Sequence, residues 1–266
     1  MAAGDVLERK DCNVCQRGHP PAPPSKGKSQ GGSVHRHFEV QLDELKDRML
    51  CMASLAEKAV HLSLEGLNNR DESKATQVIA DIEPQINDLH LELDDRALQL
   101  LALQQPMAID LRLITATMKI NSDLERMGDQ AVNIAERALS IMALPQVKPL
   151  IDIPRMAEIV EKMVKDALDA FVRRDNELAR IVVLRDDEVD HYRDQVFREL
   201  IAHMIRDPRC IQQALDLILV SRNLERIADH ATNIAEDVVY MVLGRDIRHH
   251  AEEKALARNE KTNSHN

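Results

Sequence analysis

Two copies of one segment decide the fold of this chain: LERMGDQAVNIAE at residues 124–136 and LERIADHATNIAE at residues 224–236. The copies are identical at 9 of 13 positions and lie one hundred residues apart. Shorter matches continue upstream, where 83–87 (EPQIN) corresponds to 186–190 (DDEVD), and 71–75 (DESKA) corresponds to 175–179 (DNELA). An internal repeat of this length indicates that one structural unit occurs twice.

Each unit is expected to consist of three helices. Only two glycines lie between Ser33 and Val242, and the prolines stand at expected boundaries or helix starts, so long stretches contain nothing that ends a helix. Pro106 is expected in the first turn of its helix, where a missing N–H costs nothing, and Gly244 is expected to end the last helix. The Asn and Asp side chains of residues 68–71 are expected to supply a turn and a cap. The expected helices are 35–69, 71–104, 106–143, 154–174, 175–206 and 208–243.

The third helix of each unit carries an apolar seam at spacings of three and four residues, which is typical of a helix face that packs into a core. The seams are Leu124, Met127, Ala131, Ile134 and Ala138, and, in the second copy, Leu224, Ile227, Ala231, Ile234 and Val238. Aromatic residues make up only 2% of the chain, so the core is expected to be aliphatic. The sequence therefore predicts an all-α fold of two antiparallel three-helix bundles in tandem, related by internal duplication.

Proline and glycine mark the expected boundaries of these bundles. Residues 144–154 (LPQVKPLIDIP) contain three prolines, and the first 32 residues hold five of the eight glycines and four of the ten prolines. The expected organisation is a disordered tail at 1–33, a first bundle at 34–144, a linker at 145–154, a second bundle at 155–244 and a polar tail at 245–266.

Composition excludes several classes of function. With a net charge of −10 and few flat aromatic rings, the chain is poorly suited to bind nucleic acid by charge or by base stacking. The longest run without a charged residue, 97–109, has 13 residues, whereas about 20 apolar residues are needed to span a bilayer. The N-terminus lacks the pattern of a secretory signal, and four cysteines are too few for a disulfide framework. A cytoplasmic protein with reduced cysteines is expected.

Carboxylate and amide side chains form a second stripe on the same third helices. The stripe consists of Glu125, Asp129, Asn133 and Glu136 in the first copy, and of Glu225, Asp229, Asn233 and Glu236 in the second. These spacings return to nearly the same face of an α-helix. Carboxylates four residues apart on a helix repel each other by about 0.2–0.5 kcal/mol, so a stripe that occurs twice suggests a bound cation.

The second helix of each unit offers a pair of oxygen ligands four residues apart. If it packs antiparallel to the third helix, its side chains converge on the stripe. Oxygen ligands without thiolate suit magnesium, manganese, calcium or non-haem iron better than structural zinc. The candidate metal ligands are Glu83, Asn87, Glu125, Asp129, Asp186, Asp190, Glu225 and Asp229.

Other interpretations of the acidic stripes stay open. They form either a cation site or a solvated face whose charge is neutralised by nearby arginines: Arg126, Arg137 or Arg226. Glu188 and His191 have the Glu-x-x-His spacing of ferritin-like di-iron bundles, but such enzymes use it twice and this chain has it once. His191 and His230 are either additional ligands or surface histidines, the latter being favoured.

A second candidate metal site lies near the N-terminus. Cys12 and Cys15 have part of a zinc-binding spacing, and three histidines come after them at His19, His35 and His37. No second cysteine pair accompanies them, so a disordered tail is the alternative and the favoured interpretation.

Four motifs resemble those of the PhoU family of phosphate-signalling proteins: LERMGD at 124–129, LERIAD at 224–229, the trailing NIAE in both copies, and LQQPMAIDLR at 103–112. The resemblance runs from about Phe38 to Arg248. It implies a cytoplasmic, non-catalytic negative regulator that works with the ABC phosphate transporter, through its ATPase subunit, and with a phosphate-sensing histidine kinase. It also implies a homodimer that reaches the membrane only through its partners.

The same resemblance implies metal binding, because members of this family hold multinuclear iron or zinc on their acidic motifs; manganese and magnesium are further candidates. It transfers ligand roles to Glu125, Asp129, Asp186, Asp190, Glu225 and Asp229. Asn87 stands where the pattern has an acid, so the first site, with Glu83, is expected to bind metal more weakly than the second. A ferritin-like di-iron oxidoreductase and a metal-free helical scaffold remain the alternatives.

Overall fold

The computed structural model describes residues 31–144, 152–244 and 247, with side chains from residue 37 onward. These residues form helices and contain no strand, so the predicted all-α class is confirmed. The elements are α1 (Gly31–Asn69), α2 (Glu72–Gln77), the π-helical turn η1 (Val78–Ile82), α3 (Glu83–Gln104), α4 (Ala108–Met142), α5 (Asp152–Arg173), α6 (Asn176–Arg206), the 3-10 turn η2 (Pro208–Cys210) and α7 (Ile211–Leu243). Most of the expected tails and linker, at 1–30, 145–151 and 248–266, lies outside the described residues.

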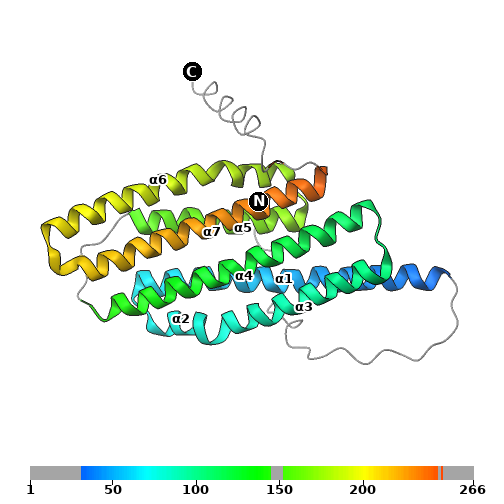
Figure 1. Cartoon of the computed structure of the whole chain (residues 1–266), viewed down its shortest axis with the longest axis horizontal. Helices are drawn as coiled ribbons and strands as arrows, with labels where there is room; N and C mark the ends of the chain where they lie inside the picture. The colour runs from blue at the N-terminus through cyan, green and yellow to red at the C-terminus, as the bar shows by residue number, and fades with distance from the viewer. Residues whose placement is uncertain (1–30, 145–151, 245–246, 248–266) are drawn as a thin grey trace, which may run out of the picture.

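The helices form two units, as the internal repeat predicts. α1, the α2–α3 segment and α4 pack together, and α5, α6 and α7 form the second unit (Figure 1). The third helices of the two units, α4 and α7, run antiparallel side by side and form the most extensive helix pair among the described residues. Buried apolar side chains from both units belong to one continuous cluster. The two bundles therefore share a single core.

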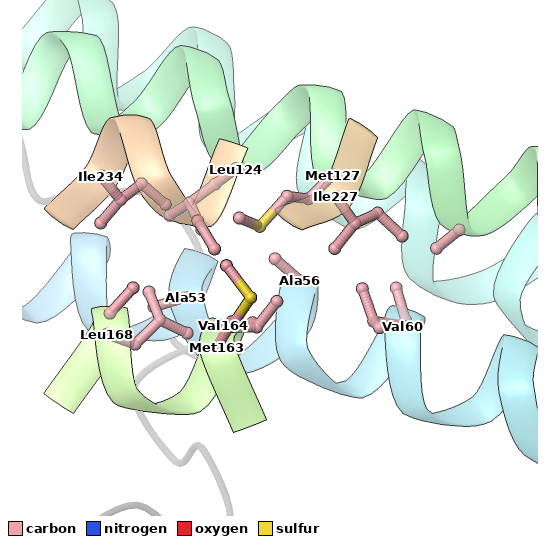
Figure 2. Packing of buried hydrophobic residues seen from close by; sticks show 14 of the residues in the cluster. Ala53, Ala56, Val60, Leu124, Met127, Met163, Val164, Leu168, Ile227 and Ile234 are labelled. Atoms are coloured by element: carbon pink, nitrogen blue, oxygen red, sulfur yellow. The ribbon is translucent and has the colours of Figure 1, made fainter. Parts of the chain in front are cut away.

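The apolar seams predicted for the third helices line this shared core. All ten seam residues are buried. Figure 2 shows where four helices meet: Leu124 and Met127 of α4, Ile227 and Ile234 of α7, Ala53, Ala56 and Val60 of α1, and Met163, Val164 and Leu168 of α5. Full burial of a Leu, Ile or Met side chain stabilises a fold by about 1.5–3 kcal/mol, so aliphatic residues suffice here.

The helix ends obey local sequence rules. The carboxylate of Asp71 accepts from the backbone N–H groups of Ser73 and Lys74 and caps α2, as expected. Asp175 caps α6 in the same way. Gly244 has a φ of 67° and donates its N–H to the Tyr240 carbonyl oxygen at 2.8 Å, which confirms it as the residue that ends α7.

Four expected helix starts are wrong. α1 begins at Gly31, inside the expected tail and four residues before the expected start. Pro106 is outside α4, because Gln105 has a φ of 45° and residues 105–107 form a non-helical connection before the helix, with Met107 as its N-cap residue. Pro208 begins a 3-10 turn, and α7 starts after it at Ile211. α5 begins at Asp152, ahead of Pro154. Proline is tolerated throughout the first turn of a helix, so it marks a start only to within a few residues.

Candidate functional site

The second repeat brings four predicted ligands together. Asp186 and Asp190 come from α6, and Glu225 and Asp229 come from α7, which packs along it. Partial burial, together with the negative charges of Glu225, Asp186 and Asp190, raises the pKa of Asp229 to about 6, while His230 opposes the shift. The pair of helices therefore places three negative charges close enough to Asp229 to oppose its ionisation.

An arginine that was not among the predicted residues lies in this group. Arg193 of α6 donates through Nη1 to Asp190 Oδ1 at 2.9 Å and to Glu225 Oε1 at 2.7 Å, so it joins the two helices. Burial alone would lower the pKa of Arg193, but hydrogen bonds and charges from Asp194, Asp190 and Glu225 raise it. Its position three residues after Asp190 was the available signal, since such residues are neighbours on a helix.

The arginines expected to neutralise the stripes have other environments. Arg137 pairs with buried Asp216 at 3.4 Å, away from the predicted ligands, and Arg126 and Arg226 are exposed. Thr232 of α7 donates to Asp186 Oδ1 at 3.3 Å, which gives that carboxylate a neutral partner.

In the first repeat, as in the second, one pair of candidate ligands lies on the second helix and the other pair on the third. Asn87 Nδ2 of α3 donates to Glu83 Oε1 at 2.6 Å, so these two side chains are paired with each other. Between them, Ile86 faces Gly128 of α4 so closely that a Cβ at residue 128 would lie 3.0 Å from Ile86 Cδ1. This contact holds the α3 pair next to the stretch of α4 between its two acids.

The acids of the two third helices match in their degree of burial. Glu125 and Glu225 are half-buried, whereas Asp129 and Asp229 are exposed. The repeats differ in the second helix, where the first has the neutral Asn87 and the second has Asp190. The donor chemistry of the second repeat therefore fits a hard cation better than that of the first.

The predicted ligands do not form a completed metal site in this arrangement. Among residues 37–144, 152–244 and 247, no three His, Cys, Asp or Glu side chains are grouped closely enough to hold a metal ion. In the second repeat, Arg193 holds Asp190 and Glu225 on its guanidinium. The electrostatic grouping around Asp229 and the absence of a coordination cluster are compatible, because charges interact over longer distances than metal–oxygen bonds.

Asn233 of the second stripe and the neighbouring His230 face the first repeat instead. His230 Nδ1 lies 2.9 Å from Asp123 Oδ1, and Asn233 Nδ2 donates to the same oxygen at 3.3 Å. With only 13% of its side chain exposed, His230 is not the surface histidine that was favoured. Glu236 is buried and Glu136 is exposed, so the repeats diverge at this end of the stripe.

The structure does not support the Glu-x-x-His motif or the N-terminal cysteine and histidine motif as metal sites. Glu188 and His191 are both exposed on α6, whereas the ligands of a di-iron bundle project into its core. Cys12, Cys15 and His19 lie outside the described residues, as does the side chain of His35, and His37 is exposed. The two described cysteines, Cys51 and Cys210, are not joined in a disulfide.

Comparison with known proteins gives consistent matches. The sequence model of the PhoU domain matches residues 49–138 and 153–238. A protein of Pseudomonas aeruginosa named phosphate-specific transport system accessory protein PhoU homolog is 39% identical over 217 residues, covering 81% of this chain and 89% of that protein. The protein of the same name from Aquifex aeolicus is 42% identical over 215 residues, covering 80% and 97%.

Solved structures agree with these sequence matches. The crystal structure of PhoU from Pseudomonas aeruginosa superposes with a TM-score of 0.76 at 39% identity and covers 78% of this chain and 100% of that one. The crystal structure of the phosphate transport system regulatory protein PhoU from Streptococcus pneumoniae gives a TM-score of 0.72 at 28% identity, with coverage of 79% and 98%.

Proposed function

Since this chain belongs to the PhoU family, we propose that it is a metal-binding, non-enzymatic negative regulator of phosphate uptake and of the phosphate-starvation response. It acts as an adaptor between the ATPase subunit of an ABC phosphate transporter and a phosphate-sensing histidine kinase. Relatives named as accessory proteins of the phosphate-specific transport system support the regulatory part of this proposal. Two helical units without a recognisable catalytic arrangement among the described residues are suited to hold partners together.

The observation that carries the metal-binding part is the grouping of four acids on the packed helices α6 and α7, three of them near Asp229. Asp186, Asp190, Glu225 and Asp229 would hold the stronger site. The equivalent residues of the first repeat, Glu83, Asn87, Glu125 and Asp129, would hold the weaker one. A bound iron, zinc, manganese or magnesium ion would supply the positive charge that links two helices. Arg193 links α6 and α7 through Asp190 and Glu225, so it would have to release these two carboxylates for a metal to bind them.

Metal binding is tested by elemental analysis and by titration of metal-free protein with iron, zinc or manganese. We expect Glu225→Ala/Asp229→Ala to weaken binding by at least about tenfold and Glu125→Ala/Asp129→Ala to remove only a weaker component. Asp187→Ala/Glu188→Ala is the matched control, since it removes two exposed acids from the same part of α6. Equal metal content in all four proteins would contradict the proposal.

The regulatory part needs a separate measurement. Loss of the chain should raise a phosphate-starvation reporter in phosphate-rich medium, and the protein should co-purify with the transporter ATPase. An unchanged reporter would refute regulation, whatever the metal content. We also propose that the protein works in the cytoplasm as a homodimer that meets the membrane through its partners. In the part of the chain that the structure describes, no helix is long and apolar enough to cross a membrane.

A further inference from the structure

The two repeats differ in length by one residue at a defined place. The N-cap residues Asp71 and Asp175 are equivalent, and so are the first predicted ligands, Glu83 and Asp186. Twelve positions separate cap and ligand in the first repeat, but eleven separate them in the second. The first repeat therefore contains an extra residue between two points that have the same structural role.

The extra residue coincides with the π-helical turn. Residues 78–82 form η1, and the N–H of Glu83 bonds to the carbonyl oxygen of Val78, five residues back. The corresponding stretch of the second repeat is regular α-helix within α6. A π turn contains more residues than an α turn, so it absorbs one additional residue without rotating the remainder of the helix.

Buried residues after this stretch show that the second helix turns the same face toward the core in both repeats. Ile86 in the first repeat and Val189 in the second are equivalent, and both are buried, with exposures of 0% and 1%. In an uninterrupted α-helix, one inserted residue would rotate everything after it by about 100°. Such a rotation would take Ile86 off Gly128 and turn Glu83 and Asn87 away from α4.

A proline accompanies the extra residue. Pro84 comes just after the π turn, whereas the second repeat has Asp187 at the equivalent position. In a regular α-helix, the proline ring clashes with the carbonyl four residues back, here that of Ala80, and leaves it without its donor. The π turn directly precedes Pro84: the N–H of Glu83 reaches back to the Val78 carbonyl, so the helix is already widened where the proline ring approaches it.

We infer that the π turn Val78–Ile82 and Pro84 form one register adaptor. The extra residue makes room for the proline, and the proline disfavours a regular α-helix over the same stretch. Together they connect the cap at Asp71 to the α3 face that meets α4. The π turn can be removed only together with Pro84, to give the regular helix of the second repeat, whereas Pro84 can be replaced alone because the π turn can remain. This inference is independent of metal binding.

The experiment is a double-change cycle on the full chain, with thermal unfolding as the readout. Deletion of Ala80 alone forces Pro84 into a regular helix, so Tm should fall by about 6–12 °C. Pro84→Asp alone should change Tm little, because the π turn can remain. Deletion of Ala80 combined with Pro84→Asp recreates the pattern of the second repeat. That double variant should return to within about 3 °C of the wild type.

Deletion of Leu184, which lies in the corresponding stretch of α6, is the matched control. It shortens a stretch with no π turn to absorb the change, so it should prevent folding or lower Tm more than any other variant. Rescue of the Ala80 deletion by Pro84→Asp supports the inference even if the single deletion fails to fold. The inference is overturned if the double variant is no more stable than the single deletion, or if the single deletion costs nothing.

Discussion

Among single residues, Asp229 shows that the acidic stripe of the second repeat places like charges close to one another. Its carboxylate is on α7, near Glu225 on the same helix and near two aspartates of α6. Arg193 neutralises part of this group but bonds to Asp190 and Glu225 rather than to Asp229. The stripe was readable from the sequence, whereas the choice of carboxylates that Arg193 contacts depends on the distance between two helices.

The pKa of Asp229 gives a pH prediction. Folding raises it from an ordinary value of 3.8 to about 6, so the folded state binds this proton more tightly than the unfolded state. Metal-free protein therefore loses stability as pH rises from about 4 to about 6. Asp229→Asn should remove this loss and exceed the wild type by about 1 kcal/mol at pH 7.5, after allowance for the screening of an exposed group.

Urea unfolding in the presence of a chelator, at pH 4 and at pH 7.5, measures the effect of Asp229→Asn. The two proteins should be nearly equal in stability at pH 4. Asp129→Asn is the control in the first repeat, where Asn87 replaces one acidic neighbour, and its gain should be smaller. Lower stability of Asp229→Asn at pH 7.5 would show that the carboxylate is favourably placed in the metal-free protein.

At the level of helices, the second and third helix of each unit carry different residues at equivalent positions in the two repeats. The first repeat pairs Ile86 with Gly128, and the second has Val189 and Ala228 at the equivalent positions. The first repeat therefore has the larger side chain on its second helix and no side chain on its third. The second repeat has the smaller valine on its second helix and a methyl group on its third. This compensation sets how closely α3 approaches α4, and so where the candidate ligands of the two helices lie.

Exchanging these residues tests the compensation. Gly128→Ala gains about 1 kcal/mol of helix propensity, but its Cβ would lie 3.0 Å from Ile86 Cδ1, so we expect a net loss of about 1 kcal/mol. Ile86→Val removes that Cδ1 and alone costs about 0.5–1.5 kcal/mol. The double variant should be close to wild type in urea unfolding. Additive losses would show that the two sites are not coupled.

At the scale of the whole molecule, the repeats are joined by a contact that is both apolar and charged. Lys119 of α4 pairs with Asp237 of α7 at 3.1 Å, and Arg137 pairs with Asp216 at 3.4 Å. Both aspartates are buried, with exposures of 3% and 2%. A buried carboxylate that loses its partner costs several kcal/mol, so these pairs fix how α4 and α7 align and disfavour other alignments.

Residues 152–244 expressed alone should not form a stable monomer. The fragment would expose the face of α7 that carries Ile227 and Ile234 and would remove the Lys119 and Arg137 partners of two buried aspartates. We expect it to dimerise, aggregate or unfold without a cooperative transition, as measured by size-exclusion chromatography and circular dichroism. Co-expression with residues 31–144 should restore cooperative melting. A fragment that is monomeric and melts like the intact chain would disprove the shared core.

The sequence alone predicts the two helical units, their aliphatic seams, the cap at Asp71 and the end of α7 at Gly244, because periodicity, capping and glycine conformation act within a few residues of the chain. It also indicated the acidic stripes, which are fixed by spacing along one helix. The packing of the helices places the two units on one core, joins α6 to α7 through Arg193, and turns His230 toward Asp123 instead of solvent. Those outcomes depend on distances between helices far apart in sequence, and similar helix patterns are compatible with many ways of packing.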